Sequence, residues 1–161
     1  MTDDDFMQAV NRNNRRLFLI ALSFTKSSCE SEDIIQNVFL KLWKHPKSFS
    51  DGEHIDKWLT VVCVNESKNY IKSPFRYHQN IDDCDIISRA SFDNSSQIDL
   101  FNAVMGLSKK ERTVIHLFYY ESLSIKDIAE MLKIKESAVK TRLSRARVKL
   151  KEQLGDEWID E

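Results

Sequence analysis

The stretch ESLSIKDIAEMLKIKESAVKTRLSRARVKLKEQ, residues 121–153, contains two short helical patterns separated by a tight turn. Ser124 and Ser137 stand where the two helices would begin, and a serine there accepts a hydrogen bond from a first-turn amide, worth about 1 kcal/mol each. The pattern predicts a helix-turn-helix. Apolar residues recur three and four positions apart on both sides of a break at 133–137, namely Ile125, Ile128, Ala129 and Leu132 before it and Val139, Leu143, Ala146 and Leu150 after it.

The second predicted helix is strongly cationic. An α-helix fits the major groove of duplex DNA, where its N-terminal half meets base edges and flanking cations neutralise phosphates. A run of charge is otherwise only a solvated helix face, but the short helix and turn in front of it supply a docking geometry. We therefore predict duplex DNA binding. No acidic residue occurs between Glu136 and Glu152, whereas that interval holds Lys140, Arg142, Arg145, Arg147, Lys149 and Lys151.

The composition favours helices throughout. Of 161 residues, 42% are hydrophobic and 10% aromatic, which is enough for two small cores. Only three Gly and two Pro occur, and the turns of an all-β fold need more of both. The net charge of -1 combines the basic helix with an acidic tail at 156–161, and local patches decide phosphate binding. The expected fold class is all-α, with two small helical domains joined by a flexible linker.

Several classes of protein are disfavoured. Cys29, Cys63 and Cys84 are far apart and lack a CxxC motif, so we expect reduced cysteines and no metal site. The histidines are scattered, and no nucleophile–base pair or glycine-rich phosphate loop occurs, so we expect no enzyme, no catalytic residue and no cofactor. The acidic start MTDDD and a longest apolar run of only 17–22 predict a cytoplasmic protein without membrane insertion.

Three helical patterns occupy the first 75 residues. The first spans 3–25, although the polar run NRNNRR at 11–16 is expected to break it into two helices. The second, SSCESEDIIQNVFLKLWKHP at 27–46, has Ser28 or Ser31 as a candidate cap, and its apolar stripe is wide enough to face inward and outward. After a loop, the third pattern runs to Pro74, with expected inward positions at Ile55, Leu59, Val62 and Ile71.

Residues 76–96 lack periodicity and are rich in Asn, Asp and Ser. A structureless segment of about 20 residues is improbable inside one compact domain. We therefore predict an acidic linker at 76–96 between an N-terminal domain, 1–75, and a C-terminal domain, 97–161. The second domain is expected to contain a helix from Ser108, which forms a capping-box pattern with Glu111, before the helix-turn-helix.

These segments, in this order, resemble the extracytoplasmic-function sigma factors, the compact bacterial RNA polymerase specificity subunits with two helical domains. DIIQNVFLKLWKH, 33–45, is similar to the segment that holds the clamp helices of the polymerase largest subunit. WLTVVCVN, 58–65, is similar to the family's minus-ten helix, and residues 107–150 are similar to its minus-thirty-five domain. The resemblance covers nearly the whole chain.

The resemblance implies that the protein makes and breaks no bond, binds core RNA polymerase and promoter DNA, and has an anti-sigma factor as a restraining partner. It implies polymerase contacts by Asp33, Ile34, Gln36, Asn37, Phe39, Leu40 and Trp43. By analogy, the loop at 47–53 forms a pocket that compensates a few kcal/mol of unstacking of a non-template base. The implied minus-ten contacts are Ser48, Phe49, Asp51, Trp58, Asn65 and Lys68. From composition alone, Trp58 is either a stacking platform for single-stranded bases or a core residue.

Helix geometry selects the minus-thirty-five residues. With the apolar stripe facing inward, Lys140, Thr141 and Arg145 look into the groove, and Ser137 and Arg142 are placed for phosphates. In the turn, Lys133 stands where the family often has glycine, and a left-handed lysine costs about 1 kcal/mol relative to glycine.

The main alternative is a DNA-binding regulator that carries the same helix-turn-helix behind an unrelated sensing or partner domain. The segment at 33–43 discriminates between the two, because a regulator has no need of a polymerase-binding surface.

Overall fold

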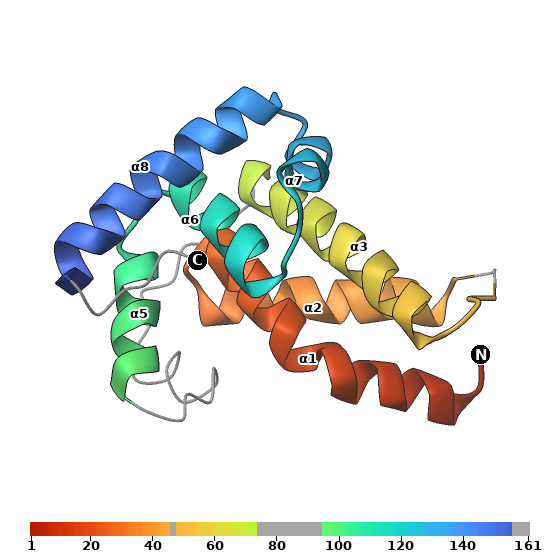
Figure 1. Ribbon diagram of the computed structural model, residues 1–161. Coiled ribbons are helices and arrows are strands. Elements are labelled where there is room, and N and C mark those ends of the chain that lie inside the picture. Colours follow the sequence, from red (N-terminus) through yellow and green to blue (C-terminus); the bar gives the residue numbers. More distant parts are fainter. Residues whose placement is uncertain (46–47, 74–94, 156–161) are drawn as a thin grey trace. The chain divides into compact units, whose positions relative to one another are not determined.

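The computed structural model describes residues 1–45, 48–73 and 95–155, which fall into two compact units, Met1–Ile81 and Asp82–Glu161. Helices dominate these residues and no strand occurs among them, so the all-α expectation is confirmed (Figure 1). Most of the predicted linker, 76–96, lies outside the described residues. Its last two positions, Ser95 and Ser96, belong to a helix. The boundaries of the linker stay a prediction. None of the described helices combines the length and apolarity needed to cross a membrane.

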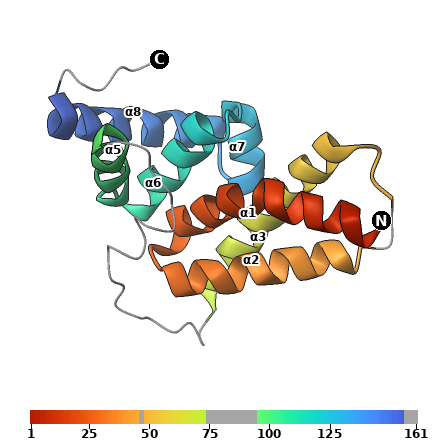
Figure 2. The ribbon, with the colours of Figure 1, turned by 90° about the horizontal axis from the view of Figure 1, so that it is seen from below.

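The first unit is a three-helix group. Each helix contacts the other two, and both views show them side by side (Figures 1 and 2). Its helices are α1 (Asp3–Thr25), α2 (Ser28–Trp43) and α3 (Gly52–Lys72). Burying each leucine or isoleucine contributes about 1.5–3 kcal/mol. The largest fully buried side chains here are Leu17, Ile20, Leu22, Ile34, Leu42 and Leu59.

Helix α1 continues unbroken through the polar run at 11–16, so the expectation of two helices is wrong. The reason is a partner on another helix. Asn13 is only 1% exposed, and its amide donates to Asp56 Oδ1 of α3 at 2.8 Å. A polar residue paired in this way stabilises the middle of a helix rather than ending it.

The caps of α2 and α3 also differ from expectation. Ser27, rather than Ser28 or Ser31, caps α2 by accepting a first-turn amide at 3.1 Å. Asp51 caps α3 in the same way at 2.8 Å, so α3 begins two residues earlier than the sequence pattern suggests.

The buried face of α3 is rotated from the predicted one. Leu59 is fully buried as expected, but Cys63 and Val64 complete the buried stripe. The apolar residues of this stretch fit both the predicted and the observed buried face. The sequence therefore does not distinguish the two faces, and packing of α3 against α1 and α2 selects the observed one. The other predicted inward positions, Ile55, Val62 and Ile71, are only half-buried.

The second unit contains the predicted helix-turn-helix. Its elements are α5 (Ser95–Met105), α6 (Lys109–Ile115), a π-helical turn η1 (His116–Tyr120), α7 (Ile125–Leu132) and α8 (Glu136–Leu154). Helix α8 contacts α5, α6 and α7, and its stripe of Val139, Leu143, Ala146 and Leu150 is at most 1% exposed. Lys133 is left-handed, with φ 57° and ψ 47°, as the turn requires. The π-helical turn has no counterpart in the sequence pattern.

Ser124 and Ser137 give a matched pair for testing helix caps. Ser124 accepts the Asp127 amide at 3.0 Å, whereas Ser137 lies inside α8, which begins after Lys135 without a side-chain cap, so the cap predicted at Ser137 is wrong. We expect Ser124→Ala to lower the free energy of unfolding of α7 by about 1 kcal/mol. Ser137→Ala should change that of α8 by less than about 0.5 kcal/mol. Hydrogen exchange of the α7 and α8 amides measures both, and equal losses would contradict the assignment.

Candidate polymerase and nucleic-acid interfaces

Helix α2, which carries the predicted polymerase-binding segment, has a buried and an exposed face. Ile34 is 1% exposed and Phe39 is 9% exposed, and both pack into the core of the unit. Side chains with so little exposed area offer little for a partner to contact, so burial favours the exposed residues of α2, while the predicted set of seven stays a prediction. The remaining residues, which we call the α2 surface, are Asp33, Gln36, Asn37, Leu40 and Trp43.

The α2 surface combines polar side chains with two exposed apolar ones. Leu40 is 49% exposed and Trp43 is 53% exposed. The Trp43 ring is held edge-on by Phe6 of α1, with ring centroids 5.0 Å apart and an angle of 72°. Leu40 and Trp43 are three positions apart and therefore share one face of α2, and exposed apolar side chains grouped in this way are typical of a protein-binding surface.

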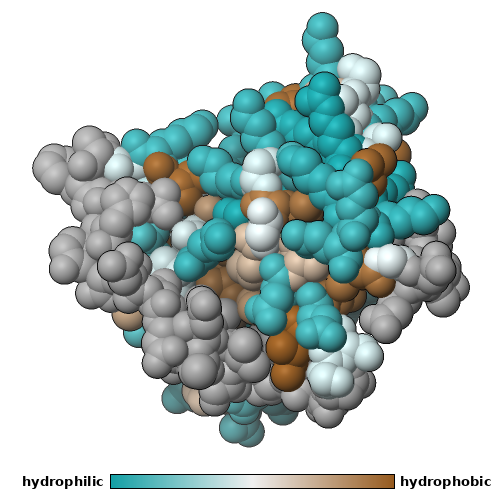
Figure 3. Space-filling model, turned by 90° about the vertical axis from the view of Figure 1, so that its left-hand side faces the viewer, coloured by the Kyte–Doolittle hydropathy of each residue, from teal (hydrophilic) through white to brown (hydrophobic). Residues whose placement is uncertain are grey.

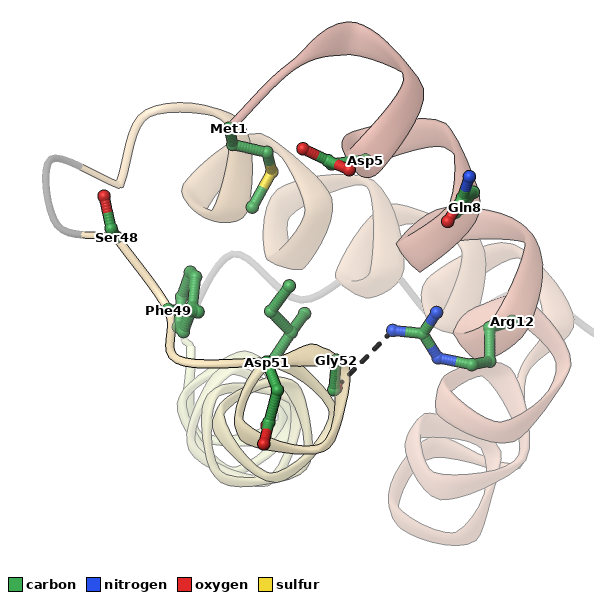
Figure 4. Close-up of a pocket in the computed structure, with 9 residues that line it drawn as sticks. Met1, Asp5, Gln8, Arg12, Ser48, Phe49, Asp51 and Gly52 are labelled. Carbon is green, nitrogen blue, oxygen red and sulfur yellow. Dashed lines mark hydrogen bonds between the residues drawn. The ribbon is translucent and has the colours of Figure 1, made fainter.

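A pocket of about 390 Å³ lies between the first turns of α1 and the segment that enters α3 (Figure 4). We call it the loop pocket. Three of the six predicted minus-ten residues line it, namely Ser48, Phe49 and Asp51. The wall from α1 was missed by the sequence analysis, since no local pattern brings these helices together. The complete lining is Met1, Asp5, Gln8, Arg12, Ser48, Phe49, Asp51, Gly52 and Ile55.

An aromatic cluster supports the pocket from behind Phe49. Its ring stacks on His45 at 4.7 Å and meets the Trp58 ring edge-on at 5.6 Å. His54 also contacts Phe49, at 5.1 Å. Trp58 is half-buried in this cluster, so its main observed role is to support Phe49. Two of the four histidines, His45 and His54, thus lie together here.

Two predicted minus-ten residues lie apart from the pocket. Asn65 is exposed and Lys68 is half-buried, both further along α3, and neither lines the loop pocket. If Asn65 and Lys68 contact DNA as predicted, they do so outside the loop pocket.

A second cavity, of about 410 Å³, lies between the beginning of α6 and the first half of α8. We call it the α8 groove. It contains four of the five predicted minus-thirty-five residues, while the fifth, Lys140, is exposed beside them. Hydrophilic side chains dominate the described part of the face in Figure 3. The groove is lined by Ser108, Lys110, Glu111, Ser137, Ala138, Thr141, Arg142 and Arg145.

Glu111 sets the charge balance of the α8 groove. Its Oε1 accepts from Lys149 Nζ at 2.7 Å and from the Ser108 hydroxyl at 2.9 Å. Ser108 caps α6 by accepting the Glu111 amide at 3.4 Å, so the N-cap half of the predicted capping box is present. Burial acts to raise the pKa of Glu111, but the hydrogen bonds to its carboxylate and the charges of Lys149 and Arg145 outweigh it and lower the pKa. The carboxylate is therefore ionised at neutral pH and balances part of the surrounding positive charge.

The middle of α8 is anchored by Arg147. Its guanidinium lies 5.5 Å from the Phe118 ring centroid and 5.6 Å from that of Tyr119, and Nε donates to the Tyr119 hydroxyl at 2.7 Å. This basic residue therefore stabilises the packing of α8 on η1, while the exposed cations nearer the start of the helix face solvent.

Comparisons with known proteins agree with this arrangement. Residues 9–74 match sigma-70 region 2, and residues 98–150 match sigma-70 region 4. The ECF RNA polymerase sigma factor SigW of Bacillus subtilis is 28% identical over 173 residues, which cover 95% of this chain and 90% of that protein. The chain belongs to the extracytoplasmic-function sigma factors. Its function is to direct core RNA polymerase to promoters, as predicted.

Other relatives of this sigma factor extend the match. The sigma factor SigV of Bacillus subtilis is 24% identical, over 92% of this chain and 90% of that protein. The sigma factor RpoE of Bartonella quintana, solved with the anti-sigma factor NepR, is 25% identical with a TM-score of 0.67 and covers 96% of this chain and 99% of its own. CnrH, solved with the cytosolic domain of CnrY, is 24% identical with a TM-score of 0.59, covers 95% of this chain and 89% of its own, and supports the fold alone.

Proposed function

We propose that this sigma factor binds core RNA polymerase through the α2 surface, captures a minus-ten base in the loop pocket and reads the minus-thirty-five element with α8. The observation that carries the proposal is that each unit has a cavity at the residues expected to contact DNA. The first lies within the region 2 match and the second within the region 4 match.

The loop pocket suits an unstacked base. Phe49 offers a half-buried aromatic ring, and Met1 and Ile55 add apolar surface around it. Stacking of a base on an aromatic side chain is worth about 1–3 kcal/mol, comparable with the few kcal/mol needed to unstack it from DNA. Capture of one base therefore offsets much of the cost of starting the bubble, without any covalent step.

The α8 groove suits duplex DNA. Arg145 and Thr141 lie in the first half of α8, which is the half that meets base edges when a recognition helix enters the major groove. Arg142 and Ser137 lie beside them, where contacts to phosphate would fix the register of the helix. The groove thus combines base readout with positioning on the backbone.

Regulation by an anti-sigma factor forms part of the proposal. The related RpoE was solved in complex with the anti-sigma factor NepR. A protein that covered the exposed Leu40 and Trp43 would block the same surface that polymerase needs. Because polymerase and promoter DNA are cytoplasmic in bacteria, we place the activity of this sigma factor in the cytoplasm.

Mapping of transcript 5′ ends tests the proposal as a whole. Core polymerase with this sigma factor is expected to give defined start sites that share two upstream elements, and core polymerase alone should not. If the 5′ ends were the same with and without the protein, while the protein alone bound duplex DNA, the chain would act as a regulator and the proposal would fail.

A further inference from the structure

Arg12 joins the two walls of the loop pocket. From α1, its Nη2 donates to Asp56 Oδ1 at 2.9 Å, and its Nε lies 3.1 Å and 3.2 Å from the two Asp56 oxygens. Nη2 also donates to the Gly52 carbonyl, at 3.5 Å, in the first turn of α3 (Figure 4). Charge-assisted bonds from a planar guanidinium to both oxygens of a carboxylate are directional as well as strong. The spacing of the two walls is therefore fixed here by one side chain.

Asp56 is the centre of a larger polar cluster, which we call the Arg12–Asp56 cluster. Besides Arg12, the buried Asn13 amide donates to its carboxylate at 2.8 Å, and Arg16 donates to its main-chain carbonyl at 3.1 Å. Burial acts to raise the pKa of Asp56, but the hydrogen bonds from Arg12 and Asn13 and the nearby cations outweigh it and lower the pKa. The carboxylate stays charged, and the cluster stays paired, at neutral pH.

The two walls approach closely at this point. A Cβ added to Gly52 would lie 3.3 Å from Arg12 Nη2, so the guanidinium already rests against the α3 backbone. The next residue towards the pocket is Asp51, whose side chain caps α3, and Phe49 lies two residues before it. A change at Arg12 or Asp56 is therefore transmitted directly to the residues that would meet a base.

We propose that Arg12 and Asp56 are positioning residues for base capture, which hold the loop pocket open through their bonds to each other and to the α3 backbone. The inference rests on the proposed function of the pocket. A pocket that is formed before DNA arrives needs no ordering on binding, and this saves free energy in the capture step. The cluster would thus favour promoter opening through geometry rather than through charge.

The test measures binding of a fork-junction promoter fragment, taken from a mapped start site, to polymerase containing the full sigma factor. One fragment has an intact minus-ten non-template strand, and the other has an abasic site at the captured position. The wild type should prefer the intact fragment. Asp56→Asn and Arg12→Gln should each weaken binding of the intact fragment by about tenfold, because bonds to charged groups are lost. Neither should change binding of the abasic fragment.

Asp56→Asn separates positioning from a direct DNA contact. It removes a negative charge and frees Arg12, so if Arg12 bound phosphate itself, both fragments would bind more tightly, and this result would overturn the proposal. Lys57→Met is the matched control, since it breaks an exposed ion pair with Glu53 on the same helix and Lys57 does not line the pocket. Its ratio of intact to abasic binding should equal that of the wild type.

The outcomes also separate this inference from the function on which it rests. If the wild type bound the two fragments equally, the base-capture function of the loop pocket would fail. If the wild type and both cluster variants preferred the intact fragment to the same extent, only the positioning role would fail. Affinity for core polymerase, measured in parallel, should be unchanged, because neither residue belongs to the α2 surface.

Discussion

Trp43→Ala is expected to weaken binding of this sigma factor to core RNA polymerase by about 30-fold or more, which corresponds to about 2 kcal/mol or more. The Trp43 ring is 53% exposed, and its contact with Phe6 fixes its orientation before a partner arrives. Tryptophan is among the residues most enriched at the energetic centres of protein interfaces. Equilibrium titration of labelled protein with core polymerase measures the loss.

Val61→Ala is the matched control for Trp43→Ala. Val61 is an exposed apolar residue, 42% accessible, but it lies on α3 outside the α2 surface. We expect less than about a twofold change, as for most surface substitutions. Far-UV circular dichroism of both variants checks that the helices remain. Equal losses of affinity for the two variants would show that α2 is not the polymerase-binding surface.

Arg145→Ala is expected to reduce transcription from the cognate promoter about 5- to 150-fold, the equivalent of about 1–3 kcal/mol for one well-made contact to a base. Arg145 is exposed and lines the α8 groove. Run-off transcription at limiting holoenzyme measures the loss, and affinity for core polymerase should not change. If polymerase binding fell as well, the assignment of Arg145 to DNA recognition would be wrong.

Lys151→Ala is the control for charge in that experiment. It removes one positive charge from the last turn of the same helix, away from the half expected to enter the major groove. Its effect should be small and similar at all promoters, because a phosphate contact carries no sequence information. The minus-thirty-five bases can also be substituted one at a time. At the base that Arg145 contacts, substitution should reduce transcription by the wild type but not by Arg145→Ala.

The apolar periodicity of the sequence predicted the second unit well and the contact residues of α2 less well. The stripe from Val139 to Leu150 is buried because its spacing fits a single helical face. In α2 the apolar residues cover a wider arc, and spacing alone cannot tell the edge that packs inward, Ile34 and Phe39, from the edge that faces solvent, Leu40 and Trp43.

Contacts between residues far apart in the chain could not be predicted in the same way. The polar run at 11–16 suggested a break, because nothing local indicates that Asn13 pairs with Asp56, 43 residues away. The same holds for the wall of the loop pocket that α1 supplies. The cap predicted at Ser137 was wrong by two residues. Helix α8 begins at Glu136, so Lys135 occupies the cap position and Ser137 already lies in the first turn.

The anchoring of Arg147 and Lys149 changes how many counterions α8 can displace from DNA. The helix has six basic side chains between Glu136 and Glu152, but Arg147 is bound to Tyr119 and Lys149 to Glu111. Each phosphate neutralised by a protein cation releases close to one condensed counterion, which is what makes binding sensitive to salt. Lys149 is neutralised by a carboxylate and Arg147 is held against two aromatic rings, so we expect α8 to displace fewer counterions than its six cations suggest. The salt dependence of promoter binding is therefore expected to be weaker than the number of basic residues in α8 alone would give.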